Sequence, residues 1–120
     1  MSEFEKTIES QLKELFPNAK IKKQYHISYQ GRDLFFDFYL PHINLLIECQ
    51  GVQHYEFNSF FHSDNKAFKD YQLRDKLKQE WAIAHERVLL ELKYDSIPDN
   101  ANNLFWYISK SIGDYGSKTN

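Results

Sequence analysis

The amino-acid sequence predicts one α/β domain with the element order αβββαβα. Three observations support this prediction: a helical pattern of apolar residues at the start, three short β-rich runs separated by turn residues, and a second helical pattern followed by one more strand. The chain has 120 residues, of which 42% are hydrophobic, enough to fill a single core. We therefore expect one domain over residues 1–112 and a polar, flexible tail over residues 113–120.

The first helix is predicted over residues 2–16. Ser2 is a suitable N-cap, and the acidic residues Glu3 and Glu5 fall in the first turn, where they interact favourably with the helix dipole. Pro17 follows the end of the pattern. The apolar residues that recur on one side, which we expect to be buried, are Phe4, Ile8, Leu12 and Leu15.

Three strands are predicted over residues 20–29, 35–40 and 45–49, each rich in β-branched, aromatic or other apolar residues. Turn residues at 31–33 and at Pro41 separate them. Connections this short favour an antiparallel meander.

A second helix is predicted over residues 66–85, with charged residues on much of its surface. Residues 55–65 before it have no clear period and read as a loop. A fourth strand over residues 87–94 and a short helix around residues 104–108 follow. The apolar residues on one side of the second helix are Leu73, Leu77, Trp81 and Ala84.

Composition restricts the class of protein more than its partner. A single cysteine, Cys49, and the absence of a long apolar run predict a protein without membrane contact, in a reducing cytoplasm. The net charge of -2 does not favour nucleic-acid binding, although lysines at 20–23 and on the second helix can still form basic stripes. Charge alone leaves the partner undecided.

Two carboxylates interrupt apolar strands of the predicted meander. Strand alternation places Asp37 on the face opposite Phe36, Phe38 and Leu40, and places Glu48 and Gln50 opposite Leu45, Ile47 and Cys49. If the two strands pair, the carboxylates share one face, where burial is costly without a cation or hydrogen bonds. A divalent metal such as Mg²⁺, held by one or two carboxylates plus waters and phosphate oxygens, explains this placement.

Further polar residues fall near the same place. His54 follows the turn at Gly51 and can move a proton or contact phosphate, although a histidine by itself is more often structural. Asp75 and Lys78 lie one turn apart on the second helix, away from its apolar side, where a solvated ion pair is the ordinary interpretation. A zinc hydrolase using His54 and His62 is a poor alternative, because that spacing fits no common zinc pattern.

Three motifs in this order resemble the PD-(D/E)XK nuclease superfamily. They are LFFDFYLP at 34–41, LIECQGVQHY at 46–55 and RDKLK at 74–78. Within the superfamily the chain is similar to the very-short-patch repair endonuclease-like group, which includes phage homing endonucleases with an E, D, X, H, D signature. The resemblance covers roughly residues 5–94 and implies a restriction-endonuclease-like core with a mixed, mostly antiparallel sheet flanked by helices. It also implies that the cytoplasm is that of a bacterial or phage-infected cell.

Carried over to this sequence, the resemblance implies a metal site and a set of catalytic residues. Asp37 and Glu48 would ligate the metal, with the backbone carbonyl of Cys49 as a further ligand. Gln50 stands where many members have lysine, and Lys78 is a hypothetical substitute for that positive charge. The remaining members of the signature are matched by Glu5, His54 and Asp75.

The favoured interpretation is a Mg²⁺- or Mn²⁺-dependent endonuclease that hydrolyses DNA phosphodiester bonds, by nicking or by double-strand cleavage, through a metal-activated water. A homodimer, or a partner that supplies sequence recognition, is compatible with the small size of the chain. Two alternatives stay open. One is a nuclease-fold module that binds nucleic acid or protein without cutting, and the other is a nuclease for RNA or branched DNA.

Overall fold

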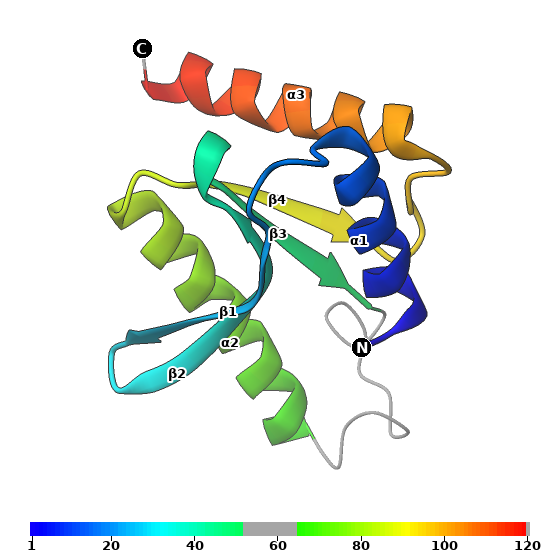
Figure 1. Cartoon of the computed structure of the whole chain (residues 1–120). Helices are drawn as coiled ribbons and strands as arrows, with labels where there is room; N and C mark the ends of the chain where they lie inside the picture. The colour runs from blue at the N-terminus through cyan, green and yellow to red at the C-terminus, as the bar shows by residue number, and fades with distance from the viewer. Residues whose placement is uncertain (52–64, 120) are drawn as a thin grey trace.

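A computed structural model of the chain describes residues 1–51 and 65–119. It is an α/β structure with the predicted order of elements (Figure 1). These elements are helix α1 (Glu3–Leu15), strands β1 (Lys22–Tyr29) and β2 (Arg32–Leu40), a short 3-10 helix η1 (Pro41–Ile43), strand β3 (Leu45–Gln50), helix α2 (Asn65–Ala84), strand β4 (Val88–Lys93) and helix α3 (Ala101–Thr119).

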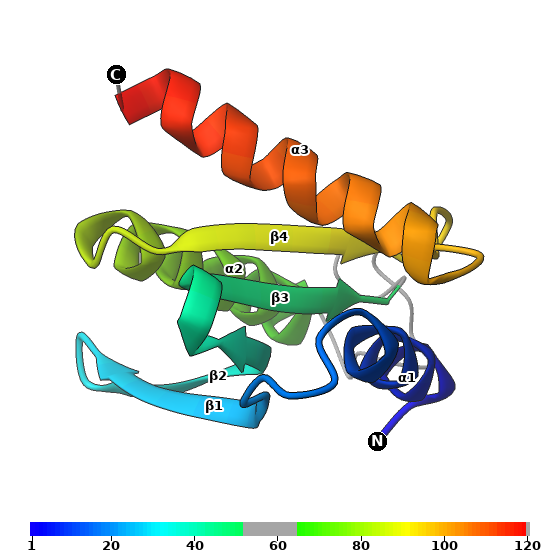
Figure 2. The ribbon, with the colours of Figure 1, turned by 45° about the horizontal axis from the view of Figure 1, so that its top comes forward.

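The four strands form one mixed sheet in the order β1-β2-β3-β4. The first three strands pair antiparallel, as the short turns predicted, and β4 pairs parallel to β3. Helix α2 makes the connection between these two parallel strands. Helices α1 and α3 lie next to each other over one face of the sheet, and α2 lies on the other face (Figures 1 and 2).

Helix α1 forms where the sequence predicted it. The side chain of Ser2 accepts a hydrogen bond from the backbone N–H of Glu5 at 3.1 Å, which caps the first turn. Ile8 and Leu12 are fully buried, and Phe4 and Leu15 pack against the same core. The predicted apolar stripe is therefore confirmed, and it fixes which side of the helix faces the sheet.

The core is divided by the sheet into two clusters. The first lies between the sheet and helices α1 and α3, and includes Phe38 and Leu40 of β2. The second lies between the sheet and helix α2, and includes Phe36 of β2 together with Trp81. The two helical layers are thus held by separate sets of apolar side chains.

Strand β2 contributes to both clusters because its alternation of faces is interrupted at Asp37. The sequence placed Phe36, Phe38 and Leu40 on one face, and this prediction is wrong for Phe36. Opposite the break, Gln24 of β1 has φ 49°, a left-handed conformation that extended residues do not adopt. Side chains before and after this point alternate out of phase between the two faces of the sheet. Asp37 therefore lies at the transition between two regular halves of the strand.

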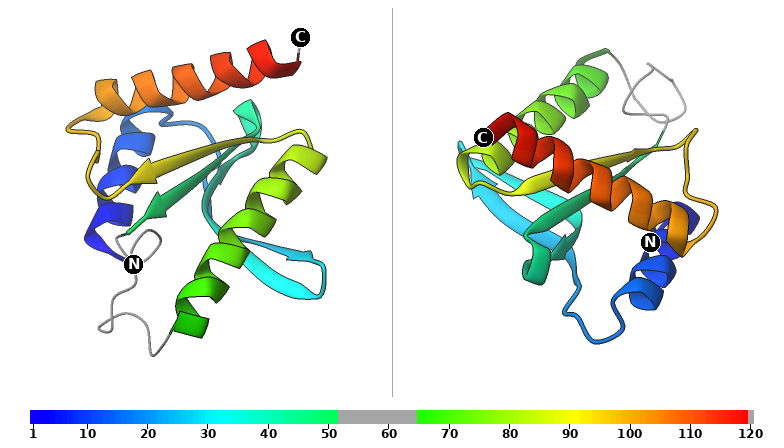
Figure 3. Two further views of the ribbon diagram at one scale, coloured as in Figure 1. Left: turned by 180° about the vertical axis from the view of Figure 1, so that it is seen from behind. Right: turned by 90° about the horizontal axis from the view of Figure 1, so that it is seen from above.

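Helix α3 is longer than predicted. It continues through Gly113 to Thr119, whereas the sequence predicted a polar tail from residue 113. Tyr115 packs against the core cluster of α1 and α3, and this contact accounts for the additional turns. Figure 3 shows α3 lying over β4 at an angle to the strand. No helix in the described part of the chain is long and apolar enough to span a membrane.

Candidate functional site

Asp37 and Glu48 come together where strands β2 and β3 stop pairing. The last paired residues of the two strands are Phe38 and Ile47. Beyond them, hydrogen bonds from backbone N–H groups to side-chain carboxylates take the place of backbone pairing. The backbone N–H of Asp37 donates to Oε1 of Glu48 at 3.1 Å, and the backbone N–H of Cys49 donates to Oδ2 of Asp37 at 2.7 Å. Each carboxylate is therefore fixed by an N–H of the opposite strand, and the predicted proximity of the two acids is confirmed.

Helix α2 supplies the positive charge for this pair of acids. Nζ of Lys78 donates to Oε2 of Glu48 at 3.2 Å, and the two side chains are 14% and 5% exposed. The Lys78 ammonium also lies 5.8 Å from the ring centroid of Phe36. Lys78 thus occupies a low-dielectric environment beside the carboxylates, as the hypothesis of a substitute for a strand lysine requires.

Burial controls the protonation of both acids. It raises the pKa of Glu48 to about 8, an effect that the Lys78 ammonium opposes and the Asp37 carboxylate reinforces. Burial also raises the pKa of Asp37, opposed by the Cys49 N–H and reinforced by Glu5. Two neighbouring carboxyl groups with raised pKa values are typical of a site that binds a cation or moves a proton.

Helix α1 adds a third acid through Gln24. The amide nitrogen of Gln24 lies 3.3 Å from Oε2 of Glu5 and 3.4 Å from Oδ1 of Asp37, so one side chain bridges the two carboxylates. The left-handed backbone of Gln24 positions this amide. Glu5, which had the weakest support from the sequence, is placed at the site together with Asp37.

These residues line a pocket of about 250 Å³ between the β1–β2 hairpin, α1 and α2. Asp75 lines it from α2, on the same side of the helix as Lys78. Arg74, Tyr71 and Phe35 complete the lining, with Phe35 46% exposed. The pocket therefore combines four acids with two cations and two aromatic rings.

Two predicted site residues do not join this pocket in the described structure. The buried side chain of Gln50 donates to Oε2 of Glu91 on β4, away from Asp37. His54 lies outside the described residues, as do His62 and the loop 55–64. Cys49 lines the pocket, and burial raises the pKa of its thiol above the ordinary range.

Four lining residues had no assigned site role in the sequence prediction: Gln24, Phe35, Tyr71 and Arg74. Gln24 carries no sequence signal, because its role depends on the backbone at one position of β1. Arg74 and Tyr71 lie within one turn of Asp75, so a helical wheel centred on Asp75 and Lys78 identifies them. Arg74 also pairs with Asp70 at 2.9 Å, and the same carboxylate pairs with Arg32 of β2.

The donor set is compatible with a hard divalent cation. Asp37 and Glu48 offer carboxylate oxygens, which Mg²⁺ and Mn²⁺ prefer, and such ions complete their shells with water and phosphate oxygens. Within residues 1–51 and 65–119, no three His, Cys, Asp or Glu side chains are arranged as a metal cluster. Among the described side chains, the candidate ligands are the carboxylates of Asp37 and Glu48, whose oxygens accept hydrogen bonds from backbone N–H groups and from Lys78.

Comparison with known proteins finds viral relatives. Uncharacterized protein 033L of Invertebrate iridescent virus 3 is 41% identical over 64 residues, which is 53% of this chain and 33% of that protein. Uncharacterized protein 307L of Invertebrate iridescent virus 6 is 37% identical over 62 residues, or 52% of this chain and 32% of that protein. The chain thus matches about a third of the length of these curated relatives. No protein-family model and no solved structure matches it.

Proposed function

We propose that the chain is a metal-dependent endonuclease that hydrolyses DNA phosphodiester bonds at the pocket of Asp37 and Glu48, within a restriction-endonuclease-like core. One observation carries the proposal: the buried carboxylate of Glu48 and the half-buried carboxylate of Asp37 meet where β2 and β3 stop pairing. Lys78, 14% exposed, faces them, and α1 and α2 supply further acids. Structural ion pairs seldom need so many acids in one pocket, whereas metal-assisted hydrolysis does.

Asp37 and Glu48 would hold Mg²⁺ or Mn²⁺. The bound cation would polarise the scissile phosphate and lower the pKa of the attacking water. The Cys49 N–H orients Asp37, and the Asp37 N–H orients Glu48, so backbone groups of the two strands preorganise both carboxylates.

The cationic side chains of the pocket would act on the phosphate. The Lys78 ammonium, which contacts Glu48 at 3.2 Å, lines the same pocket and would contact a phosphate oxygen there. Arg74 lies at the rim, where it can contact the next phosphate along the strand. Gln50, tied to Glu91, supports β3 in this proposal and does not activate water.

The remaining residues of the signature would complete the site. Asp75 and Glu5 line the pocket from two helices and would orient waters around the cation. His54, four residues after the last residue of β3 in the sequence, would assist proton transfer. A homodimer or a recognition partner would convert single nicks into paired or sequence-specific cuts.

The proposal is tested by digesting supercoiled plasmid, linear duplex, single-stranded DNA, branched DNA and RNA with Mg²⁺ or Mn²⁺. Asp37→Ala should abolish cleavage while the far-ultraviolet circular dichroism stays unchanged. Asp33→Ala is the matched control, because Asp33 lies on the same strand but is exposed and outside the pocket. Full activity of Asp37→Ala, or no cleavage by the wild type on any of these substrates, would refute the proposal.

A second candidate is a nuclease-fold protein that binds without cutting. The observation that favours it is Gln50, which stands where many members of the resembled superfamily have lysine and is engaged by Glu91. The two functions differ in metal affinity. Calorimetry with Mn²⁺ should show binding that Asp37→Asn weakens if the chain is a nuclease, and no such binding if it is a module of the second kind.

A further inference from the structure

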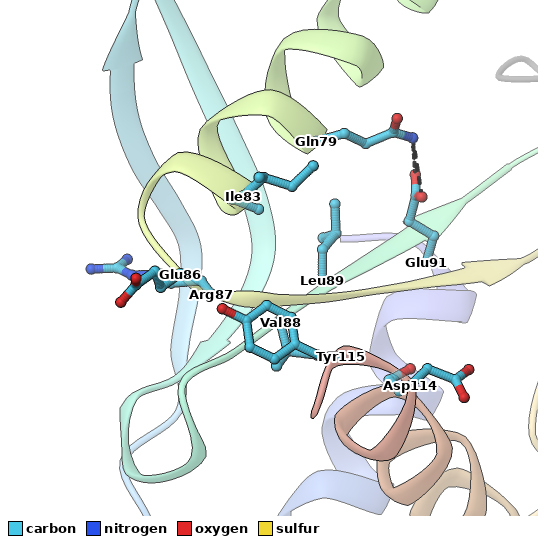
Figure 4. Close-up of a pocket in the computed structure, with 11 residues that line it drawn as sticks. Gln79, Ile83, Glu86, Arg87, Val88, Leu89, Glu91, Asp114 and Tyr115 are labelled. Atoms are coloured by element: carbon cyan, nitrogen blue, oxygen red, sulfur yellow. Dashed lines mark hydrogen bonds between the residues drawn. The ribbon is translucent and has the colours of Figure 1, made fainter. Parts of the chain in front are cut away.

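A second groove of the described structure, which shares no lining residue with the acidic pocket, lies around the free edge of β4. It has a volume of about 660 Å³ and is lined from both sides of the sheet. Helix α2 contributes Ala82 and Ile83, β4 contributes Leu89 and Glu91, and α3 contributes Asp114 and Tyr115 (Figure 4). Because α2 and α3 cover opposite faces, a groove that touches both must pass around the edge of the strand.

The floor of the groove is the edge strand β4, whose outward backbone N–H and C=O groups can form hydrogen bonds with another strand. Within the described residues β4 has a strand neighbour on one side only, which is β3. The N–H of Val88 donates to the carbonyl of Asn44, at 3.1 Å, so Val88 is directed toward the β3 side. Successive residues of a strand alternate in this direction. The N–H and C=O of Leu89 and Glu91 therefore point into the groove.

The walls of the groove combine apolar and acidic side chains. Ile83 is 75% exposed beside the edge, and Leu89 is half-buried. Glu86, Glu91 and Asp114 supply three negative charges. The one cation of the lining, Arg87, is turned away: its guanidinium lies 4.5 Å from the ring centroid of Tyr39, inside the second core cluster. The charge that faces an incoming chain is therefore negative.

We propose that this groove binds an extended, lysine- or arginine-rich segment of a partner protein, which adds to the sheet as a strand beside β4. The backbone of Leu89 and Glu91 supplies hydrogen bonds, Ile83 and Tyr115 flank alternate side chains, and the acids attract the basic ones. This binding is independent of the proposed nuclease activity.

Charge decides between this occupant and the others. A second copy of the chain, paired edge to edge through β4, would bring two sets of Glu86, Glu91 and Asp114 together, and like charges oppose that contact. Nucleic acid is opposed by the same acids. A basic extended peptide is the partner that gains from both the open edge and the charge.

The test uses a fluorescein-labelled peptide of alternating lysine and valine, followed by fluorescence anisotropy with the full chain. We expect binding that weakens with salt and that shifts the amide resonances of Leu89 and Glu91. A peptide with glutamate in place of lysine should bind at least about tenfold more weakly. A peptide with proline at alternate positions, which lacks N–H donors for the edge, should also bind at least about tenfold more weakly.

Two double variants distinguish the effect of the groove's charges on peptide binding from the effect of the net charge of the chain. Glu86→Lys with Asp114→Lys reverses two groove charges and should weaken the lysine peptide about tenfold. Glu14→Lys with Asp95→Lys changes the net charge equally at exposed positions outside the groove and should leave its affinity unchanged. Four results would overturn the proposal: no binding of the lysine peptide, equal binding of the glutamate or proline peptides, equal loss in both variants, or a dimer in sedimentation that Ile83→Glu dissociates.

Discussion

The ammonium of Lys78 lies 3.2 Å from Oε2 of Glu48, and the two side chains are 14% and 5% exposed. This contact joins helix α2 to strand β3 through two side chains that are mostly shielded from water. A buried ion pair of this kind contributes little net stability, but its loss is costly because one charge is left without compensation. The pair therefore links the stability of the fold to the protonation of the candidate site.

Lys78→Met should lower the free energy of unfolding by about 2–4 kcal/mol at pH 9, where Glu48 is largely ionised and left without its cation. The loss should be smaller at pH 6, because the Glu48 carboxyl is then protonated and needs no counter-charge. Urea denaturation at both pH values measures the difference. Lys76→Met, at an exposed position on the same helix, should cost less than about 0.5 kcal/mol at either pH. Equal losses for the two variants would show that the pair is not buried as described.

The raised pKa of Glu48 predicts a direction for the pH dependence of stability. Its carboxyl binds a proton more tightly in the folded chain, with a pKa of about 8, than in the unfolded chain, where the ordinary value is 4.5. The free energy of unfolding therefore falls as the pH rises from about 4.5 to about 8, by on the order of 5 kcal/mol. The raised pKa of Asp37 acts in the same direction.

Glu48→Gln removes this titration. The variant should therefore lose little stability between pH 5 and pH 8, the range that lies between the unfolded and folded pKa values of Glu48. Glu14→Gln, at an exposed position on α1, should retain the wild-type curve. Thermal unfolding measured across this range provides the comparison. Stability that rises with pH in the wild type would contradict the assignment of Glu48 as a buried acid with a raised pKa.

We expect Arg87, which lies outside the candidate site, to be a second determinant of stability. Its guanidinium donates to the hydroxyl of Tyr25 at 2.9 Å and lies 4.5 Å and 4.9 Å from the ring centroids of Tyr39 and Trp81. Arg87→Ala should lower the free energy of unfolding by about 2–4 kcal/mol. Arg87→Lys should recover only part of this, because an ammonium keeps the charge but not the planar stacking.

The control for this prediction is Arg74→Ala, which removes an exposed ion pair with Asp70 and should cost less than about 1 kcal/mol. Urea denaturation followed by circular dichroism gives all three values. If Arg87→Ala is as mild as Arg74→Ala, the aromatic environment of Arg87 does not stabilise the fold.

The regular elements were predictable because each carries a strong local pattern. Ser2 with Ile8 and Leu12 identified α1, and the short turns identified the antiparallel strands. The proximity of Asp37 and Glu48 also followed from alternation and pairing. These features depend on residues close in the sequence, for which periodicity is informative.

Other features depend on contacts between distant elements and were not predictable. The reversal of faces at Asp37 requires the left-handed Gln24 on the neighbouring strand, and both faces of β2 are apolar, so periodicity gives no indication of it. The orientation of Gln50 depends on Glu91, which is brought near only by the parallel register of β3 and β4. The length of α3 depends on Tyr115 reaching the core, in a segment whose composition is polar.

The central claim is that the carboxylates of the pocket support metal-dependent cleavage, and the rate of nicking of supercoiled DNA in Mg²⁺ tests it most directly. The wild type should nick the plasmid, a chelator should stop it, and Glu48→Gln should be at least about a hundredfold slower. Glu14→Gln should match the wild type. Equal rates for Glu48→Gln and the wild type, or nicking that continues in the chelator, would contradict the claim.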